Sequence, residues 1–306
     1  MGGVIIFLVI FLVLGSSILA ISEDDFPGWM NEINYKTSES NKSMVIDPTR
    51  IIQLSWKPRA FLYKGFLSDE ECEHLKNLAR GKLEKSMVAD NESGKGVLSE
   101  IRTSSGTFID KHHDKIVRCI EERIATFTFL PEENGEALQV LKYQHGEKYE
   151  PHFDFFQDKY NAQLGGHRIA TVLMYLSNVR KGGETVFPNA PDPQTKDDSW
   201  SECAKKGLAV KPVKGDALLF FSLSPDVTPD TMSLHGSCPV IEGEKWSATK
   251  WIHVDSFDKP RKAVGCKDEN ANCAEWAAMG ECQKNPSYMV GTDAYPGSCR
   301  GSCRVC

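Results

Sequence analysis

Six of the ten cysteines of this chain fall within its last segment, residues 266–306. They are Cys266, Cys273, Cys282, Cys299, Cys303 and Cys306. Cysteine at that density predicts a small separate module held together by disulfides in an oxidising compartment. A zinc cluster is the competing interpretation. The long gap between Cys282 and Cys299 and the lack of two paired CxxC motifs disfavour it. Spacing alone leaves the pairing pattern open.

The N-terminus is apolar almost without interruption from Val4 to Ile21, and Glu23 follows shortly after. A transmembrane helix needs about 20 apolar residues and the core of a signal peptide roughly 7–15, so the stretch falls between the two. No Lys or Arg precedes it to orient it. We expect residues 1–21 to be either a cleaved signal peptide or a membrane anchor through residues 4–21. Either one predicts a secretory location, in the lumen of the endoplasmic reticulum or the Golgi.

Residues 22–47 are polar and unpatterned, and we interpret them as a lumenal linker. Asn41 and Asn91 each begin an Asn-x-Ser sequon, which makes them candidate glycosylation sites. The net charge of −6 comes from acidic and basic residues mixed throughout the chain. Because no basic stripe is present, a nucleic-acid partner is not expected. The sequence does not indicate an oligomeric state.

Helical patterns precede most of the strand patterns. Ser68 and Glu71 form a capping box before one helix, and an amphipathic segment from Ile116 to Phe127 must end before Pro131. Later segments are rich in β-branched or aromatic residues: Gln139–Tyr143, His167–Leu176, Thr185–Phe187, Asp216–Leu223 and Lys245–Val254. This order predicts an α+β fold, with flanking helices packed on an antiparallel barrel or double sheet. The stretch 189–201 is expected to be a long exposed loop.

The triplet His152-Phe153-Asp154 is the first candidate for chemistry. Residues two apart in an extended strand point to the same side, so His152 and Asp154 should converge. His235 is a candidate third ligand. Two histidines and one carboxylate leave open positions on iron, enough for a bidentate oxoacid and O₂. Zinc accepts the same ligands, so the three residues do not decide the metal, and such triplets also arise by chance.

Lys245 strengthens the oxoacid interpretation, because it follows His235 by ten residues at the start of a predicted strand. A cation there can reach the far carboxylate of a ligand whose other end chelates the metal. The alternative is a solvated lysine at a strand edge.

Five segments together resemble the prolyl 4-hydroxylase family, in particular the plant enzymes that act on hydroxyproline-rich glycoproteins. In chain order they are Glu100–Gly106, Tyr149–Asp154, His167–Leu176, Gly182–Pro188 and Lys245–His253. The resemblance covers roughly residues 55–255. It implies a double-stranded β-helix (jelly-roll) core with N-terminal flanking helices, in a dioxygenase domain that we place at residues 48–257.

The resemblance also implies roles for individual residues. His152, Asp154 and His235 would hold Fe(II), and Lys245 would pair with the distal carboxylate of 2-oxoglutarate. Many related oxygenases use Arg at that last position. The cosubstrate pocket would also include Tyr143 and Thr185. The peptide groove would be formed by Tyr149, Arg168, Trp251 and His253, although plain core packing is the alternative for each aromatic residue.

The implied reaction is hydroxylation of peptidyl proline to 4-hydroxyproline in proline-rich secreted or cell-wall glycoproteins. It is coupled to oxidative decarboxylation of 2-oxoglutarate to succinate and CO₂, with O₂ as oxidant and L-ascorbate to rescue oxidised iron. Two alternatives stay open: a non-catalytic lumenal protein that binds proline-rich or glycan ligands, and a dioxygenase that hydroxylates another residue. The intact set of His152, Asp154, His235 and Lys245 speaks against the first alternative.

The tail, residues 266–306, resembles the sea-anemone-toxin-like (ShKT) module. That resemblance implies the pairs Cys266–Cys306, Cys273–Cys299 and Cys282–Cys303. Cys203 and Cys238 are candidates for a further disulfide, and Cys72 and Cys119 have no assigned role. The loop 90–96 and the segment from Asn189 resemble the mobile segments that close over substrate in the hydroxylase family.

Overall fold

A computed structural model describes residues 45–89, 96–156, 161–163, 165–192, 195–258, 267–291 and 297–305. The expectations for residues 1–21, for most of the linker, for Asn41 and Asn91 and for the pair Cys266–Cys306 lie outside the described residues. Within these ranges no helix is both long enough and apolar enough to cross a membrane.

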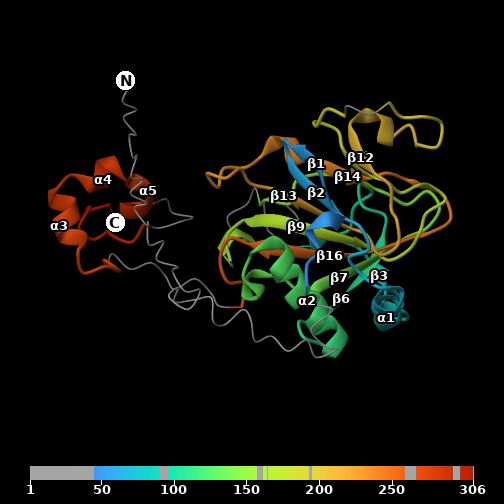
Figure 1. The fold of residues 1–306 in the computed structure, drawn as a ribbon, viewed down its shortest axis with the longest axis horizontal. Coiled ribbons are helices and arrows are strands. Elements are labelled where there is room, and N and C mark those ends of the chain that lie inside the picture. The colour runs from blue at the N-terminus through green and yellow to red at the C-terminus, as the bar shows by residue number, and fades with distance from the viewer. Residues whose placement is uncertain are drawn as a thin grey trace, which may run out of the picture. The chain divides into compact units, whose positions relative to one another are not determined.

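Two antiparallel sheets make up most of the molecule (Figure 1). The larger has eight strands, in the spatial order β1 (Ile51–Trp56), β2 (Arg59–Tyr63), β13 (Ala217–Phe221), β9 (Arg168–Tyr175), β16 (Lys245–His253), β7 (Leu138–Tyr143), β6 (Ser105–Ile109) and β3 (Glu84–Lys85). The smaller has four, in the order β12 (Leu208–Val210), β11 (Thr185–Phe187), β14 (His235–Ser237) and β8 (Tyr149–His152). Two further two-stranded sheets complete the strands: β10 (Lys181–Gly182) with β15 (Val240–Glu242), and β4 (Val88–Ala89) with β5 (Gly96–Val97).

The central strand β16 is buried along its whole length. Alternate residues of a strand point to opposite faces of the sheet, and here the two faces differ in chemistry. Trp246, Ala248 and Ile252 enter the hydrophobic core on the helix side. Lys245 and Thr249 point the other way and line a cavity between the sheets. One strand therefore builds the core with one face and the site with the other.

Helices α1 (Asp69–Ala79) and α2 (Lys115–Thr128) contribute Leu75, Ile120 and Ile124 to the core on the outer face of the larger sheet. The predicted capping box is present: Glu71 N–H donates to Ser68 Oγ at 3.2 Å, and Ser68 N–H donates to Glu71 Oε2 at 2.8 Å. The remaining helical segments of the main domain are single 3₁₀ turns: Pro48–Arg50, Glu132–Asn134, Asn161–Gln163, Ala204–Lys206 and Thr231–Ser233.

The α+β architecture and its jelly-roll core are confirmed. A second core cluster fills the space between the sheets, with Tyr175 and Phe220 from the larger sheet and Phe187 and Leu208 from the smaller. The expectation for residues 189–201 was wrong in one respect: the stretch is a loop, but Ala190 is only 2% exposed. Strands such as β12, β14 and β15 were not predicted, because three residues are too few to show a period.

The C-terminal module contains three short helices, α3 (Cys273–Ala278), α4 (Glu281–Lys284) and α5 (Pro286–Met289). Two of the implied disulfides, Cys273–Cys299 and Cys282–Cys303, are confirmed. Cys273 and Cys299 are fully buried with Met289, so the disulfide itself is a large part of this small core. Assignment of the module to the ShKT family stays a prediction.

Candidate active site

The two histidines of the site face each other across neighbouring strands. His152 ends β8, His235 begins β14, and the two residues are direct cross-strand partners. Their ring centroids are 4.4 Å apart. Asp154 lies beyond the end of β8, so the prediction of one strand running through both residues was wrong. Its carboxylate nevertheless reaches both rings, with Oδ1 at 3.7 Å from His152 Nε2 and Oδ2 at 3.6 Å from His235 Nε2.

The hydrogen bonds of the His152 and His235 rings determine which ring nitrogen is free to bind a metal. Nδ1 of His152 lies 2.8 Å from the carbonyl oxygen of Glu150, and Nδ1 of His235 lies 2.9 Å from that of Ser233. Because a carbonyl only accepts, each Nδ1 must carry the hydrogen and donate it, which leaves the Nε2 lone pair directed at Asp154. Thr171 Oγ1 donates to Asp154 Oδ2 at 2.6 Å and holds the carboxylate in place. Such outer hydrogen bonds are the usual support of metal ligands.

The pKa values of His152 and Asp154 suit a cation. Burial and the neighbouring His235 together lower the pKa of His152 to about 3. Burial would raise the pKa of Asp154, but His235 and His152 hold it at about 2. Ligand atoms of the three residues lie within 4.8 Å of one another. Two imidazole nitrogens and a carboxylate on one side of an open cavity fit Fe(II).

A second cluster, His112, Glu121 and Glu132, has comparable spacing. It does not fit a cation, because the ammonium of Lys250 already lies 2.5 Å from the buried carboxylate of Glu121. We therefore regard it as an ion-pair cluster.

Lys245 is 1% exposed, so the alternative of a solvated lysine is wrong. Its ammonium donates to Ser237 Oγ at 2.8 Å and lies 5.2 Å from the ring centroid of Tyr143, its partner on β7. Burial lowers the pKa of Lys245 to about 7. Among the residues described, no carboxylate forms an ion pair with it. A buried amine without a counter-charge, lining the same cavity as His235, fits an anionic ligand.

Both other residues expected beside the cosubstrate also line this cavity. Tyr143 is 3% exposed, and Thr185 is 2% exposed. The Thr185 hydroxyl is 2.8 Å from that of Tyr175, which fixes its direction. The structure thus brings together every residue predicted for the metal and cosubstrate ends.

The four residues expected in the peptide groove divide into two pairs. Tyr149 and Trp251 line the cavity. Tyr149 stacks on the ring of His152 with centroids 3.6 Å apart, and burial raises its pKa to about 12. The indole N–H of Trp251 is buried and has no partner within the described part of the chain. An unsatisfied donor at the cavity wall is unusual for plain core packing and suits a bound acceptor.

Arg168 and His253 do not line the cavity but lie directly beside it. The Arg168 guanidinium covers the ring of Trp251 at 4.0 Å and donates to Glu136 through Nε at 2.5 Å and Nη2 at 3.0 Å. His253 places Nε2 at 2.8 Å from Glu136 Oε1 and Nδ1 at 2.9 Å from the carbonyl of Gly166. Both ring nitrogens face acceptors, so contacts at both ends hold the ring in place. Burial would raise the pKa of Glu136, but Arg168 and His253 hold it at about 2.

Comparisons with known proteins agree with this geometry. The model of the 2OG-Fe(II) oxygenase superfamily matches residues 138–253, which include the His-Asp-His set and Lys245. Probable prolyl 4-hydroxylase 7 of Arabidopsis thaliana is 65% identical over 277 residues, which cover 90% of this chain and 87% of that protein. Prolyl 4-hydroxylase 2 of the same plant is 61% identical over 274 residues, covering 87% and 91%. The chain belongs to the prolyl 4-hydroxylase family.

Among solved structures, a viral collagen prolyl hydroxylase from Paramecium Bursaria Chlorella virus-1, in its 2OG complex, is 28% identical. The match has a TM-score of 0.47 and covers 63% of this chain and 94% of that one. As a member of the prolyl 4-hydroxylase family, the chain is a dioxygenase that uses Fe(II), 2-oxoglutarate and O₂.

Several residues of this hydroxylase site carried no predicted role. Ser237 lies two positions after His235, so the same alternation that pairs strand residues would have placed it in the cavity. Thr171 and Arg102 stood inside the resembling segments without an assignment. Arg102 lines the cavity, with its guanidinium 4.7 Å from the ring centroid of Tyr149. Glu136 gave no sequence signal, because only the tertiary structure brings it to Arg168.

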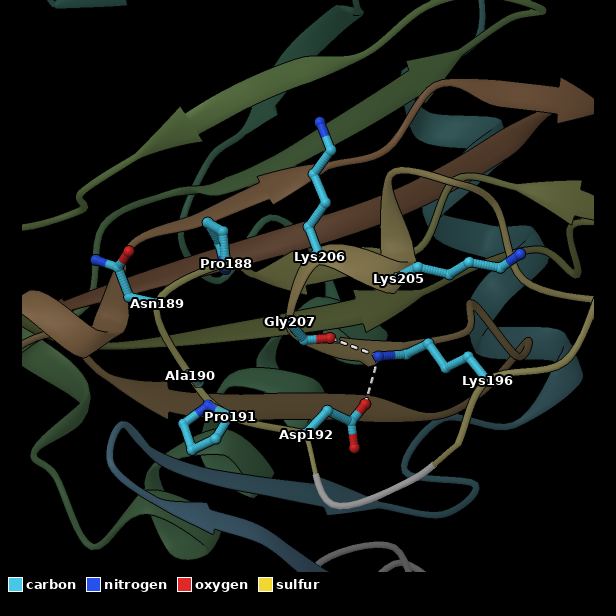
Figure 2. Close-up of a pocket in the computed structure, with 9 residues that line it drawn as sticks. All are labelled: Pro188, Asn189, Ala190, Pro191, Asp192, Lys196, Lys205, Lys206 and Gly207. Carbon is cyan, nitrogen blue, oxygen red and sulfur yellow. Dashed lines mark hydrogen bonds and ion pairs between the residues drawn. The ribbon is translucent and has the colours of Figure 1, made fainter.

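A separate hollow lies on the segment that joins β11 to β12 (Figure 2). Its lining includes three lysines, of which Lys196 is nearly buried. The Lys196 ammonium pairs with Asp192 and donates to the carbonyl of Gly207. This charge is therefore already satisfied within the fold. The contact ties the segment after Asn189, predicted to close over substrate, back to the start of β12.

Proposed function

We propose that this chain hydroxylates peptidyl proline to 4-hydroxyproline in proline-rich secreted or cell-wall glycoproteins. One observation carries the proposal: the half-buried His152 and the buried Asp154 and His235 face an unpaired buried Lys245 across a single cavity. That arrangement provides a metal end and an anion end at once. The names of the plant relatives support proline as the residue modified.

The residues of the chain bind and orient, and bound iron with 2-oxoglutarate and O₂ supplies the oxidant for a C–H bond. Lys245 and Ser237 hold the distal carboxylate of the cosubstrate. Tyr149 and Trp251 offer aromatic faces to a proline-rich peptide, whose polyproline II conformation is already ordered before binding. The unpaired Trp251 indole N–H can donate to a peptide carbonyl. Arg168 supports Trp251 from behind and fixes its plane.

A secretory setting is part of the proposal, with the chain in the lumen of the endoplasmic reticulum or the Golgi. The disulfides Cys203–Cys238, Cys273–Cys299 and Cys282–Cys303 support it, because such bonds persist in oxidising compartments. The apolar residues 4–21 would direct or anchor the chain there, and Asn41 and Asn91 would be open to glycosylation. L-Ascorbate would keep the iron reduced.

The test is succinate release from 2-oxoglutarate with a panel of proline-rich peptides, with and without Fe(II). We expect peptide-dependent and iron-dependent succinate, and a 4-hydroxyproline residue in the product by mass spectrometry. Asp154→Ala serves as the inactive control and Asp226→Ala, on an exposed loop, as the matched active one. Hydroxylation of a different residue would support the alternative dioxygenase. Peptide binding without any turnover would support the non-catalytic binding protein and overturn the proposal.

A further inference from the structure

Two buried lysines on β16 differ in their counter-charges. Lys250, which is 2% exposed, has the carboxylate of Glu121 at 2.5 Å. Lys245, which is 1% exposed, has only the hydroxyl of Ser237 in hydrogen-bonding contact among the described residues. A buried amine with no counter-charge loses its proton easily, because burial penalises the charged form. A neutral Lys245 would be a poor partner for an anionic cosubstrate.

Glu184 is the opposite case, a buried acidic residue without a basic partner among the described residues. It is 1% exposed, yet no lysine, arginine or histidine of the described chain forms an ion pair with it. Its carboxylate instead accepts two hydrogen bonds from Ser201, from the backbone N–H to Oε1 at 3.0 Å and from the hydroxyl to Oε2 at 2.8 Å. Burying a carboxylate without a cation is costly. The site therefore contains one uncompensated buried charge of each sign.

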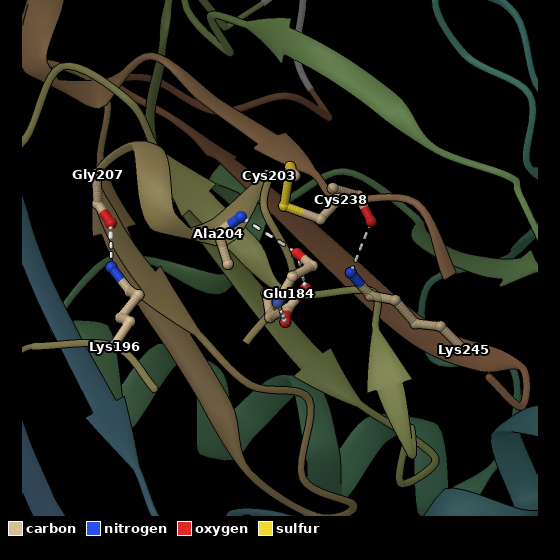
Figure 3. The surroundings of a disulfide bond; sticks show 9 residues. Glu184, Lys196, Cys203, Ala204, Gly207, Cys238 and Lys245 are labelled. Carbon is tan, nitrogen blue, oxygen red and sulfur yellow. Dashed lines mark hydrogen bonds between the residues drawn. A yellow bond between two sulfur atoms is a disulfide. The ribbon is translucent and has the colours of Figure 1, made fainter. Parts of the chain in front are cut away.

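The backbone places these two charges close together. The carbonyl of Glu184 accepts from Cys238 N–H at 2.8 Å, and Cys238 directly follows Ser237, the residue that holds the Lys245 ammonium. Gly183 packs against the same lysine, since a Cβ at that position would lie 3.4 Å from Lys245 Cδ. Figure 3 shows Glu184 and the amine of Lys245 beside the Cys203–Cys238 disulfide.

We propose that Glu184 is a positioning residue that keeps Lys245 protonated from a distance, so that its ammonium stays charged and free for the cosubstrate carboxylate. This rests on the proposed function. The two Ser201 hydrogen bonds hold the Glu184 carboxylate away from contact. A direct ion pair, like that of Lys250, would occupy the N–H groups that the ligand needs. In a low-dielectric interior, opposite charges still attract appreciably without touching.

The other groups around Lys245 do not supply this charge. The rings of Tyr143 and Tyr175 face it at 5.2 and 5.8 Å, and both phenols are neutral at working pH because burial raises their pKa. The cation Arg102 shares the cavity and can only oppose protonation. Asp154 shares it too, but its charge is committed to the histidines. The pKa of Lys245 follows this pattern: burial lowers it and Glu184 raises it.

The experiment is equilibrium binding of 2-oxoglutarate to the anaerobic, Fe(II)-loaded full chain by calorimetry, from pH 6 to 9. Binding needs a protonated Lys245, so wild-type affinity should fall as pH rises above about 7. Glu184→Gln removes the charge and can still bond to Ser201, with the amide oxygen accepting from the backbone N–H and the amide NH2 donating to the hydroxyl. Loss of an attracting charge lowers the pKa of an amine, here by about one unit. We therefore expect about tenfold weaker binding than wild type at pH 8, and binding within about twofold at pH 6.

Glu184→Asp separates charge from shape, because it retains the charge and shortens the side chain. Its affinity should fall at the same pH as that of the wild type. A Glu184→Gln curve that coincides with the wild type, or that is weaker by one factor at every pH, overturns the inference. If the Gln variant does not fold, Glu184→Met removes the same charge: a curve that falls at lower pH than that of the wild type supports the inference and an unshifted one overturns it. No 2-oxoglutarate binding by the wild type would overturn the proposed function itself.

Discussion

Replacing Lys245 by methionine should make the ligand-free protein more stable. The amine has an ordinary pKa of 10.5, and burial lowers it to about 7 in the folded chain. The amine therefore binds its proton more tightly in the unfolded state than in the folded state. Folding at pH 8 must release that proton. Each pKa unit corresponds to about 1.4 kcal/mol, so this costs about 3 kcal/mol at pH 8. Loss of the Ser237 hydrogen bond offsets about 1 kcal/mol, which leaves a net gain of about 2 kcal/mol for Lys245→Met.

The gain must depend on pH in a fixed direction. Above about pH 10.5 both states hold a neutral amine, so the wild type has no penalty and the variant is less stable by the lost hydrogen bond, about 1 kcal/mol. The gain should grow as the pH falls towards 7 and stay constant below that. Urea unfolding of both proteins at pH 7, 8, 9 and 10 measures it.

Lys250→Met provides the matched control on the same strand. It removes a buried cation whose partner, Glu121, remains buried, and such a change costs about 3–5 kcal/mol. The two substitutions should therefore have opposite signs. A Lys245→Met protein that is less stable than the wild type at every pH would refute the reasoning, because it would show that the amine is stabilised within the empty site.

Three further predictions concern activity, 2-oxoglutarate binding and iron binding. Asp154→Ala should abolish Fe(II)-dependent succinate release while circular dichroism shows an intact fold; full activity under limiting iron would remove Asp154 from the site. Lys245→Ala should weaken 2-oxoglutarate binding by about 2–5 kcal/mol with the iron dependence unchanged, and Lys245→Arg should retain part of the affinity; an unchanged KM for 2-oxoglutarate contradicts this role. Thr171→Val should reduce iron affinity about 10–100-fold in a chelator competition, since it removes the hydrogen bond to Asp154; equal affinity would show that the carboxylate orients itself.

Local patterns predicted the site better than they predicted its strands. The spacing of His152 and Asp154 suggested convergence, and the two groups do converge, although β8 ends at His152. Cosubstrate residues such as Lys245 were placed by the family resemblance, and their burial agrees with it. The pairing of His152 with His235 needed the register of β8 with β14, which short strands do not reveal in sequence.

Long-range electrostatics was beyond the sequence for a different reason. Lys245 and Lys250 are five residues apart, so alternation places them on opposite faces of the strand, but it does not show which face carries an acidic partner. Glu121 of α2 forms an ion pair with Lys250, whereas Glu184 accepts a hydrogen bond from Ser201, a loop residue. Likewise, Glu136 meets Arg168 and His253 only because β9 and β16 are neighbours in the folded sheet. Pair partners of this kind depend on topology, which a single sequence does not contain.

Because His152 and His235 lie on neighbouring strands, a bound metal would also connect two parts of the backbone. β8 and β14 are only four and three residues long, and their register shifts after His235, so few backbone bonds join them. A cation bound by both rings would join these strands at their shared end and would act as a removable cross-link of the smaller sheet. By mass action, binding of the cation stabilises the folded state. The smaller sheet should therefore be more rigid when the cation is bound than when it is removed. Chelation should therefore speed amide hydrogen exchange in β8 and β14 and leave β16 protected.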